Sequence, residues 1–192
     1  MPIMSFPEAD TPPPLRTQVL DLHQEAWPSP GPAAPADQPT HDPALTPLSL
    51  LLVDGDQVLA ALDILHKTID HAGRRYRAAG LSTVVTRQAA RGQGHGARLV
   101  AHARSVMAQT GTDVGLFTCD RPLQGFYERA GWSLVPGAVL LGGTPEDPLR
   151  SDEAGFDKVV MAGFLSAAGQ QGQGSFAHSE IALYPGPIDR LW

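Results

Sequence analysis

The chain has 192 residues, of which 42% are hydrophobic, a length that fits one domain with a substantial core and is too short for two of ordinary size. Its formal net charge of -6 argues against nonspecific nucleic-acid binding, which usually requires a basic surface, and is compatible with a cationic substrate. The single cysteine, Cys119, excludes an internal disulfide, and no group of cysteines and histidines has zinc-site spacing, so we predict no metal and a reducing compartment.

The N-terminal part of the chain is rich in proline. Residues 1–14 lack the basic and apolar regions of a signal peptide, and no apolar run approaches membrane-spanning length, so we expect a cytosolic (cytoplasmic) protein without a membrane partner. Residues 15–27 carry apolar side chains at helical spacing behind prolines that suit a helix start. Residues 28–47 contain too many prolines for a regular element, which predicts a surface connection or a lid over a substrate site.

Extended segments separated by turn signals follow. Asp54-Gly55-Asp56 is a hairpin signal, and residues 70–74 contain a second turn. Gly80 is expected to mark a break or a bulge. An antiparallel meander is therefore predicted, with extended chain at residues 48–53, 58–69, 75–79 and 81–86.

A glycine cluster comes next, at Gly92, Gly94 and Gly96, and helical spacing of apolar residues begins directly after it. A helix start offers N–H groups without intrahelical partners and the positive end of the helix dipole, and both favour an anion. Glycines let the backbone approach a phosphate closely, and Arg91 adds a positive charge. The pattern predicts a pyrophosphate site at residues 91–96.

Residues 113–118 contain the fully apolar run VGLF, which is typical of a strand buried on both faces. Because it follows a crossover helix, it should lie parallel to the preceding strand. Asp120 is expected to cap the next short helix and Gly131 to end it, before another strand at residues 132–135.

The C-terminal part is less regular. We predict a polar loop at residues 142–155, a last clear strand at 158–164, and a mobile segment rich in glycine and glutamine at 169–175. The tail at residues 181–192 is apolar enough to return to the body of the protein.

Two motifs resemble the GNAT acetyltransferase superfamily. Arg91-Gly92-Gln93-Gly94-His95-Gly96 fits its Arg/Gln-x-x-Gly-x-Gly/Ala signature, and Phe126-Tyr127-Glu128-Arg129-Ala130-Gly131-Trp132 fits its later helix, glycine and aromatic-strand segment. The order of the expected elements agrees as well, over residues 15–164. The resemblance implies one α/β domain at residues 1–192, with a mixed sheet in which an antiparallel meander precedes a splayed parallel strand pair with flanking helices.

Other glycine-rich motifs fit less well. Gly92, Gly94 and Ala97 satisfy a loose dinucleotide-binding fingerprint, but residues 87–91 separate the strand from the first glycine, and Asp113 opens the next strand where an acid should close it. A P-loop is excluded because Gly-Lys-Ser/Thr is missing. A purely structural glycine turn stays open as an alternative.

The resemblance implies an acetyl-CoA-dependent N-acetyltransferase that acts by direct attack of a primary amine on the thioester. Residues 91–96 would bind the pyrophosphate, and the backbone of Val84, Val85 and Thr86 would hold the pantetheine and the acetyl carbonyl. Tyr127 would protonate the departing thiolate, unless it is only a packing residue. His95 would lie beside a phosphate or face solvent, and Cys119 would be a small buried hydrophobe.

The acceptor side resembles the aminoglycoside 2′-N-acetyltransferases in part, through the meander, the Tyr127 segment and the tail. The resemblance implies that Asp189 and Trp192 hold a small cationic substrate, and Ser82 and Asp152 are further candidates for binding it. Ser82 stands where that subfamily has a glutamate base, and a serine cannot act as a base at neutral pH.

The general base is therefore open. Replacement bases acting through water are Asp63, His66, Asp152 and Glu153, each of which has a solvated surface group as its alternative. The missing glutamate also keeps open a different class of function, a GNAT-like module that binds acyl-CoA without turnover.

Overall fold

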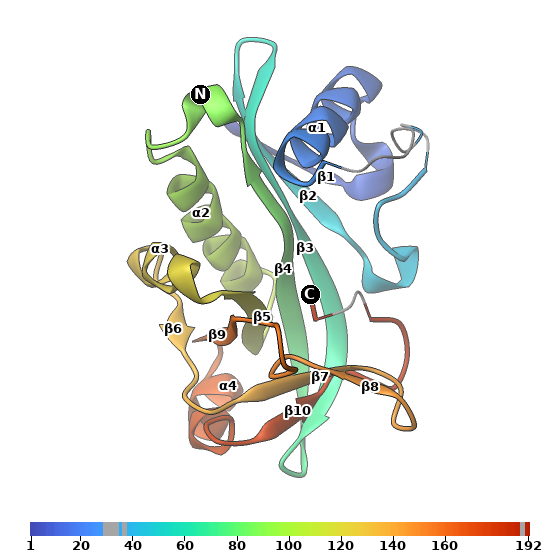
Figure 1. The fold of residues 1–192 in the computed structure, drawn as a ribbon, viewed down its shortest axis with the longest axis vertical. Helices are drawn as coiled ribbons and strands as arrows, with labels where there is room; N and C mark the ends of the chain where they lie inside the picture. The colour runs from blue at the N-terminus through green and yellow to red at the C-terminus, as the bar shows by residue number, and fades with distance from the viewer. Residues whose placement is uncertain (29–34, 36–37, 189–190) are drawn as a thin grey trace.

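A computed structural model describes residues 1–28, 35, 38–188 and 191–192 of the chain (Figure 1). The α-helices are α1 (Pro13–Ala26), α2 (His95–Gln109), α3 (Gln124–Arg129) and α4 (Ala167–Gly172). The strands are β1 (Ile3–Pro7), β2 (Leu48–Asp54), β3 (Gln57–His71), β4 (Arg74–Thr86), β5 (Val114–Asp120), β6 (Ser133–Leu134), β7 (Val139–Gly143), β8 (Pro148–Arg150), β9 (Lys158–Phe164) and β10 (Glu180–Ala182).

The strands form a seven-stranded sheet in the order β1-β2-β3-β4-β5-β9-β6 and a three-stranded sheet in the order β10-β7-β8. Strands β1 to β4 are antiparallel neighbours, which confirms the predicted meander. Strands β4 and β5 are parallel, but they pair only at Ala78 with Val114 and at Ala79 with Gly115. Beyond these two pairs the strands diverge, as the predicted splayed pair requires.

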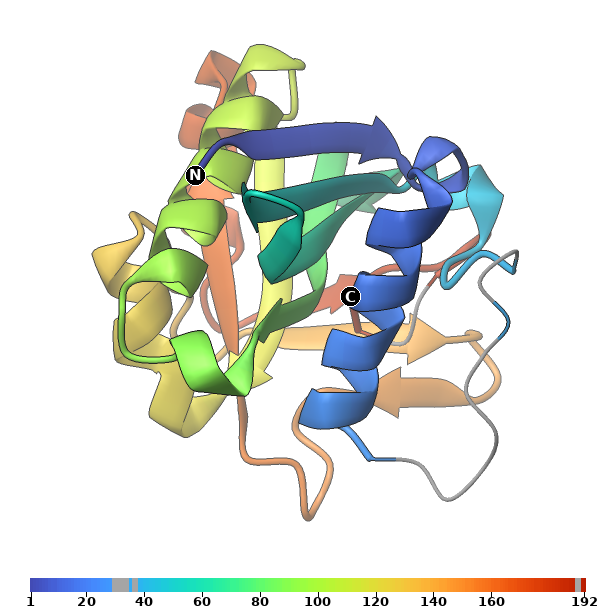
Figure 2. The same ribbon diagram turned by 90° about the horizontal axis from the view of Figure 1, so that it is seen from above.

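The two long helices lie on opposite faces of the large sheet (Figure 2). The apolar side of α2 packs with Leu50, Leu62 and Leu81 of β2, β3 and β4. The apolar side of α1 packs with a separate cluster that includes Leu51 and Val85. Alternating residues of the same strands thus fill two cores, as expected for a sheet covered on both faces. In the described part of the chain, no helix is long and apolar enough to cross a membrane.

The face that α1 covers is shared with the small sheet and the end of the chain, which Figure 1 places in front of β3 and β4. Leu183 and Leu191 of the tail are buried, so the prediction that the tail returns to the body is confirmed for its described residues. Lys67 of β3 holds the tail, because its ammonium group donates to the carbonyls of Leu183, Pro185 and Pro187.

Several local predictions were wrong. Strand β4 runs through Gly80 without a break, and its bulge lies three residues later. Asp120 makes no capping hydrogen bond and instead accepts one from Lys158 at 2.7 Å. The loop predicted at residues 142–155 contains the end of β7 and all of β8. In addition, no element was predicted at residues 1–14, which contain strand β1, paired with β2.

The segment at residues 169–175, predicted to be mobile, forms the end of α4 and a 3₁₀ turn. Ser166 caps α4 by accepting a hydrogen bond from the N–H of Gly169. A Cβ on Gly169 would lie 2.2 Å from the carbonyl oxygen of Asp113, and one on Gly172 would lie 2.0 Å from the Tyr76 hydroxyl. These glycines permit close packing and do not indicate a flexible linker.

The connection predicted at residues 28–47 is only partly described. Residues 29–34 and 36–37, and with them part of the possible lid, lie outside the described residues, as does Asp189. The end of the connection packs on the body, where a 3₁₀ turn at Pro43–Leu45 buries Leu45 completely.

Candidate functional site

The N-terminus of α2 presents free backbone donors. Gly94 precedes the helix with a φ of 82°, and the first helical hydrogen bond runs from the N–H of Arg98 to the carbonyl of Gly94. The N–H groups of residues 95–97 therefore lie ahead of the hydrogen-bonded ladder and are available to an anion. Gly92 also has a positive φ, of 78°, and open space surrounds the position of a Cβ at both glycines.

The side chains around this turn differ in exposure. Arg91 is exposed, and its Nε donates to the carbonyl of Thr86 at 3.1 Å, which keeps the guanidinium beside the turn. Gln93 is exposed as well. His95 is buried and lines a hollow of about 330 Å³ together with Arg87 and Gln93, so it does not face solvent as a free loop residue would.

Gly96 joins this turn to the end of β4. A Cβ at Gly96 would lie 2.9 Å from Oγ1 of Thr86 and 3.4 Å from Cζ of Phe126. A glycine is therefore required for the helix to start directly against β4 and α3. The predicted anion site and Thr86, a residue predicted to face the cofactor, are consequently adjacent.

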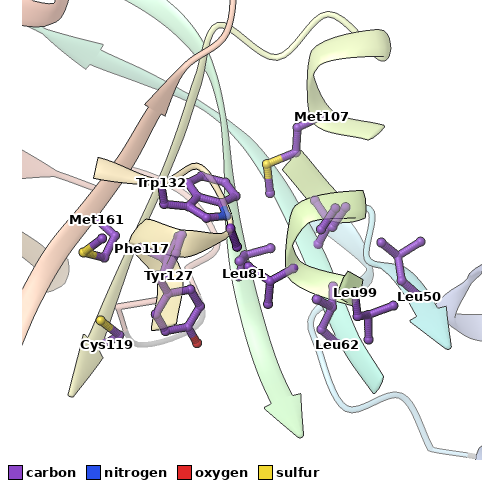
Figure 3. Close-up of a cluster of buried hydrophobic side chains, with 14 of the residues drawn as sticks. Leu50, Leu62, Leu81, Leu99, Met107, Phe117, Cys119, Tyr127, Trp132 and Met161 are labelled. Carbon is purple, nitrogen blue, oxygen red and sulfur yellow. The ribbon is translucent and has the colours of Figure 1, made fainter. Parts of the chain in front are cut away.

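Strands β4 and β5 separate on the side of the sheet where this turn lies. Residues 80–86 of β4 form no pairs with β5 in the described strands, because pairing stops at Ala79. Cys119 of β5 and Tyr127 of α3 belong to the hydrophobic cluster that lines the divergence (Figure 3). The rings of Tyr127 and Phe117 make an edge contact, with 4.9 Å between their centroids. The Tyr127 hydroxyl points away from Phe117 and Trp132 (Figure 3).

The two ionisable groups on this side are held in their neutral forms. Burial, together with the neighbouring Cys119 and Asp120, raises the pKa of Tyr127 far above its ordinary value of 10.0. Burial also raises the pKa of Cys119 to about 11, helped by Asp120. Tyr127 is thus a phenol that carries a proton at neutral pH, and Cys119 is a thiol with little thiolate character.

A bulge interrupts β4 opposite Leu62. Ala61 pairs with Val85 and Asp63 pairs with Ser82, so two residues of β4 oppose one of β3. Thr83, within the bulge, has a φ of 50°, which β-branched residues rarely adopt. Its hydroxyl donates to Oδ2 of Asp63 at 2.8 Å.

Asp63 is the centre of a buried polar cluster that the sequence did not reveal. Besides Thr83, Ser49 donates to Oδ1 of Asp63 at 2.5 Å, and Nε2 of His41 lies 3.2 Å from Oδ2. Burial alone would raise the pKa of Asp63, but the hydrogen bonds and the charge of His41 outweigh it and lower the pKa below 3.8. Asp63 is therefore a buried carboxylate and not a solvated surface group.

The structure brings two of the predicted substrate residues together. Gly80 and Ser82 lie on the same face of β4, two residues apart. Trp192 covers Gly80 so closely that a Cβ there would lie 2.3 Å from its Cγ. The indole Nε1 of Trp192 is buried without a hydrogen-bond partner among the described residues. Trp192, Ser82 and Asp63 therefore share the face of the sheet opposite α2.

The remaining candidates lie in other surroundings. Asp152 is exposed and pairs with Arg150, whose Nε donates to it at 2.9 Å. Glu153 accepts a hydrogen bond from the backbone of Arg150. His66, an odd number of residues from Asp63 along β3, points to the opposite face and has its Nδ1 3.2 Å from the Thr46 carbonyl.

Comparisons with known proteins agree with this geometry. A family model described as "Acetyltransferase (GNAT) domain" matches residues 15–135. An acyl-CoA N-acyltransferase from Pseudomonas aeruginosa is 21% identical with a TM-score of 0.57, over 84% of this chain and 97% of that one. ElaA from Escherichia coli is 16% identical with a TM-score of 0.58, over 84% and 99%.

An aminoglycoside 6′-N-acetyltransferase complexed with coenzyme A is also similar, with 16% identity and a TM-score of 0.58, over 86% of this chain and 98% of that one. At these identities the likeness concerns the fold. No curated protein matches the sequence significantly.

Proposed function

Because the chain belongs to the GNAT acetyltransferase family, we propose that it transfers an acetyl group from acetyl-CoA to a primary amine of a small, cationic acceptor. The observation that carries this proposal is the divergence of β4 and β5 after Ala79, with the α2 N-terminus at one end and Tyr127 beside it. This combines an anion site, a slot lined by backbone and a buried acid.

The residues present fit acetyl-CoA. The N–H groups of residues 95–97 and the side chain of Arg91 would bind the pyrophosphate, and Gly92 and Gly94 leave the space that a phosphate needs. Gln93, His95 and Gly96 complete that turn. When bound, acetyl-CoA supplies an activated acetyl thioester.

The backbone of β4 would orient the acetyl group. Residues 84–86 lie on the part of β4 that has separated from β5, so β5 does not pair with their peptide groups, and of these the Thr86 carbonyl accepts a hydrogen bond from Nε of Arg91. A fixed N–H donor beside an acyl oxygen stabilises negative charge that develops there, an effect worth about 100-fold to 1,000-fold in turnover. Val84, Val85 and Thr86 are thus assigned to the pantetheine and the acetyl carbonyl.

Tyr127 is assigned the role of acid for the leaving sulfur. Its phenol carries a proton at neutral pH, as an ordinary tyrosine does, and because burial raises its pKa and weakens it as an acid, proton transfer requires direct contact with the sulfur. Cys119 is unsuited to carry the acetyl group itself, because a thiol whose pKa is raised to about 11 is a poor nucleophile at neutral pH. This supports direct attack of the amine over a covalent acetyl-enzyme.

The acceptor would approach from the face that holds Ser82 and Trp192, and the net charge of -6 over the whole chain is compatible with a cation. Asp152 and Asp189 stay candidates for binding a second amine of the acceptor. An aminoglycoside-like polyamine is the acceptor we propose to test first. It follows from the partial resemblance to 2′-N-acetyltransferases and from the fold shared with an aminoglycoside 6′-N-acetyltransferase.

The rival function is a module that binds acyl-CoA without turnover. It is favoured by Ser82, which cannot take a proton from the amine, and by Asp63, whose carboxylate is buried and already accepts several hydrogen bonds. Under the proposed function, water must relay the proton of the amine to a more distant base.

Two measurements separate these functions. Calorimetric titration with acetyl-CoA tests the donor site. Thiol release is then followed with a panel of primary amines: an aminoglycoside, a linear polyamine, an amino-acid amide and a short peptide. We expect binding, and turnover with at least one cationic member of the panel. Binding without turnover on any amine would favour the module, and the absence of binding would exclude both functions.

A further inference from the structure

We propose that Asp63 is a positioning residue for acetyl transfer, because its carboxylate holds the Thr83 bulge of β4 in the conformation that the acetyl-binding backbone requires. The inference rests on the proposed function, which assigns residues 84–86 to the acetyl group. Asp63 itself is buried, with only 2% of its surface exposed, and is not available to a ligand. Its effect must therefore pass through Thr83.

The positive φ of Thr83 must be stabilised by contacts with other residues. A φ of 50° is unfavourable for a β-branched residue, and such residues persist only where the surroundings fix them. The described contacts of the Thr83 side chain include one hydrogen bond, the donation to Asp63 at 2.8 Å. Removing the acceptor would leave the bulge free to relax towards ordinary extended backbone.

The Asp63 carboxylate is well suited to stabilise Thr83, because its own position is fixed by other hydrogen bonds. Ser49 of β2 donates to one carboxylate oxygen at 2.5 Å, and His41 lies 3.2 Å from the other. His41 belongs to the connection between α1 and β2, so the carboxylate is fixed by chain segments on both sides of it. Because the cluster is buried, water does not readily replace any of its members.

The bulge determines which way the proposed acetyl-binding residues face. After the bulge, Val85 packs under α1, and Thr86 faces Gly96 of α2. Because side chains alternate along a strand, β4 without the extra residue would exchange these directions. The peptide groups of residues 84–86 would then turn as well. Asp63 therefore acts on the site through the backbone and not through contact with a substrate.

The test uses Asp63→Asn, Thr83→Gly and the double variant in the full chain. Acetyl-CoA affinity is measured by calorimetry, and kcat and KM are measured with the amine of the panel that the wild-type protein acetylates fastest. We expect Asp63→Asn to lower kcat by about tenfold or more, because small displacements at a reacting centre have large effects, with acetyl-CoA affinity within about twofold of wild type.

Glycine adopts a positive φ without a stabilising side-chain contact, so we expect the kcat of Thr83→Gly to stay near the wild-type value. For the same reason, the double variant should have a higher kcat than Asp63→Asn alone. A double variant as slow as Asp63→Asn would overturn the proposal, since Asp63 would then act without Thr83. Asparagine keeps one acceptor oxygen, so Asp63→Ala is measured as well, and a wild-type kcat in Asp63→Ala, which leaves no acceptor for Thr83, would overturn the proposal.

Asp113→Asn is the matched control. Asp113 is also buried and accepts hydrogen bonds from the Ser166 hydroxyl at 2.7 Å and from the backbone of Arg77, but it lies outside the bulge. Its replacement should lower stability and leave kcat unchanged. If Asp113→Asn lost as much kcat as Asp63→Asn, general destabilisation would explain the loss in both variants, and the proposal would be overturned.

Failure of the proposed function has a separate signature, because wild-type protein would then release no thiol with any amine. In that case amide hydrogen exchange still tests the structural half of the inference. Faster exchange at residues 82–86 in Asp63→Asn than in Asp113→Asn would support it, and equal exchange would overturn it.

Discussion

Gly80→Ala should expel the Trp192 side chain from β4. The new Cβ would lie 2.3 Å, 2.4 Å and 2.6 Å from Cγ, Cδ2 and Cβ of Trp192, whereas carbon atoms in contact are about 3.5–4.0 Å apart. Gly80 does not have a positive φ, so alanine itself fits the backbone. Replacing a fully buried tryptophan by alanine costs about 3–5 kcal/mol. Trp192 is only partly buried, so we expect Gly80→Ala to cost about 2 kcal/mol.

Urea unfolding of Gly80→Ala, Trp192→Ala and the double variant measures this coupling. Both single variants lose the same packing, so the double variant should be about as stable as Trp192→Ala and not lose the sum of the two costs. Gly174→Ala is the control, because open space surrounds the position of its Cβ. Additive losses, or a Gly80→Ala variant as stable as wild type, would refute the placement of Trp192. We also expect a raised KM for the amine with unchanged acetyl-CoA affinity.

Gly94→Asp should abolish acetyl-CoA binding in calorimetry while circular dichroism shows a folded protein, because a carboxylate would stand at the anion site; retained affinity would contradict that site. Tyr127→Phe should lower kcat by about 10-fold to 100-fold with little change in acetyl-CoA affinity, and an unchanged kcat would leave Tyr127 as a packing residue. Cys119→Ala should keep at least about half of the wild-type kcat, since a thiol with a pKa of about 11 is not the nucleophile; loss of activity with intact folding would argue for an acetyl-enzyme. The folded state lowers the pKa of Asp63, so its contribution to stability is complete above about pH 4 and is lost as the pH falls through its folded pKa. The difference in unfolding free energy between wild type and Asp63→Asn should therefore shrink as the pH falls below about 4, and a constant difference would show that the carboxylate is not preferentially charged in the folded protein.

The elements that the sequence predicted well have local causes. Helix α2 begins at the predicted glycines because Gly94 supplies the positive φ before the first turn. The hairpin between β2 and β3 follows from Asp54-Gly55-Asp56. Gly131, with a φ of 90°, ends α3 as expected. In each case a few adjacent residues determine the backbone, so their identities were sufficient.

The errors concern glycines and bulges whose causes are distant in the sequence. Gly80 was expected to interrupt β4, but it is a glycine because Trp192 packs against it from the other end of the chain. The bulge lies at Thr83, whose residue type gives no such signal, because Asp63 stabilises it across the sheet. Gly169 and Gly172 suggested mobility, whereas they allow α4 to approach Asp113 and Tyr76.

The proposed pyrophosphate site and the proposed acceptor site differ in the same way, since the first depends on neighbouring residues and the second on residues distant in the sequence. A pyrophosphate is bound mainly by the backbone of one short turn. The residues that determine this site are therefore consecutive in the sequence, and the motif at residues 91–96 predicts it. An acceptor is bound by side chains, and the proposed ones on the face opposite α2, Ser82 and Trp192, come from β4 and from the tail at the far end of the chain. The side chains that bind an acceptor can be substituted without a change of fold. Ser82 in place of a glutamate is therefore compatible with an intact donor site, and the acceptor must be identified by experiments on that face of the sheet.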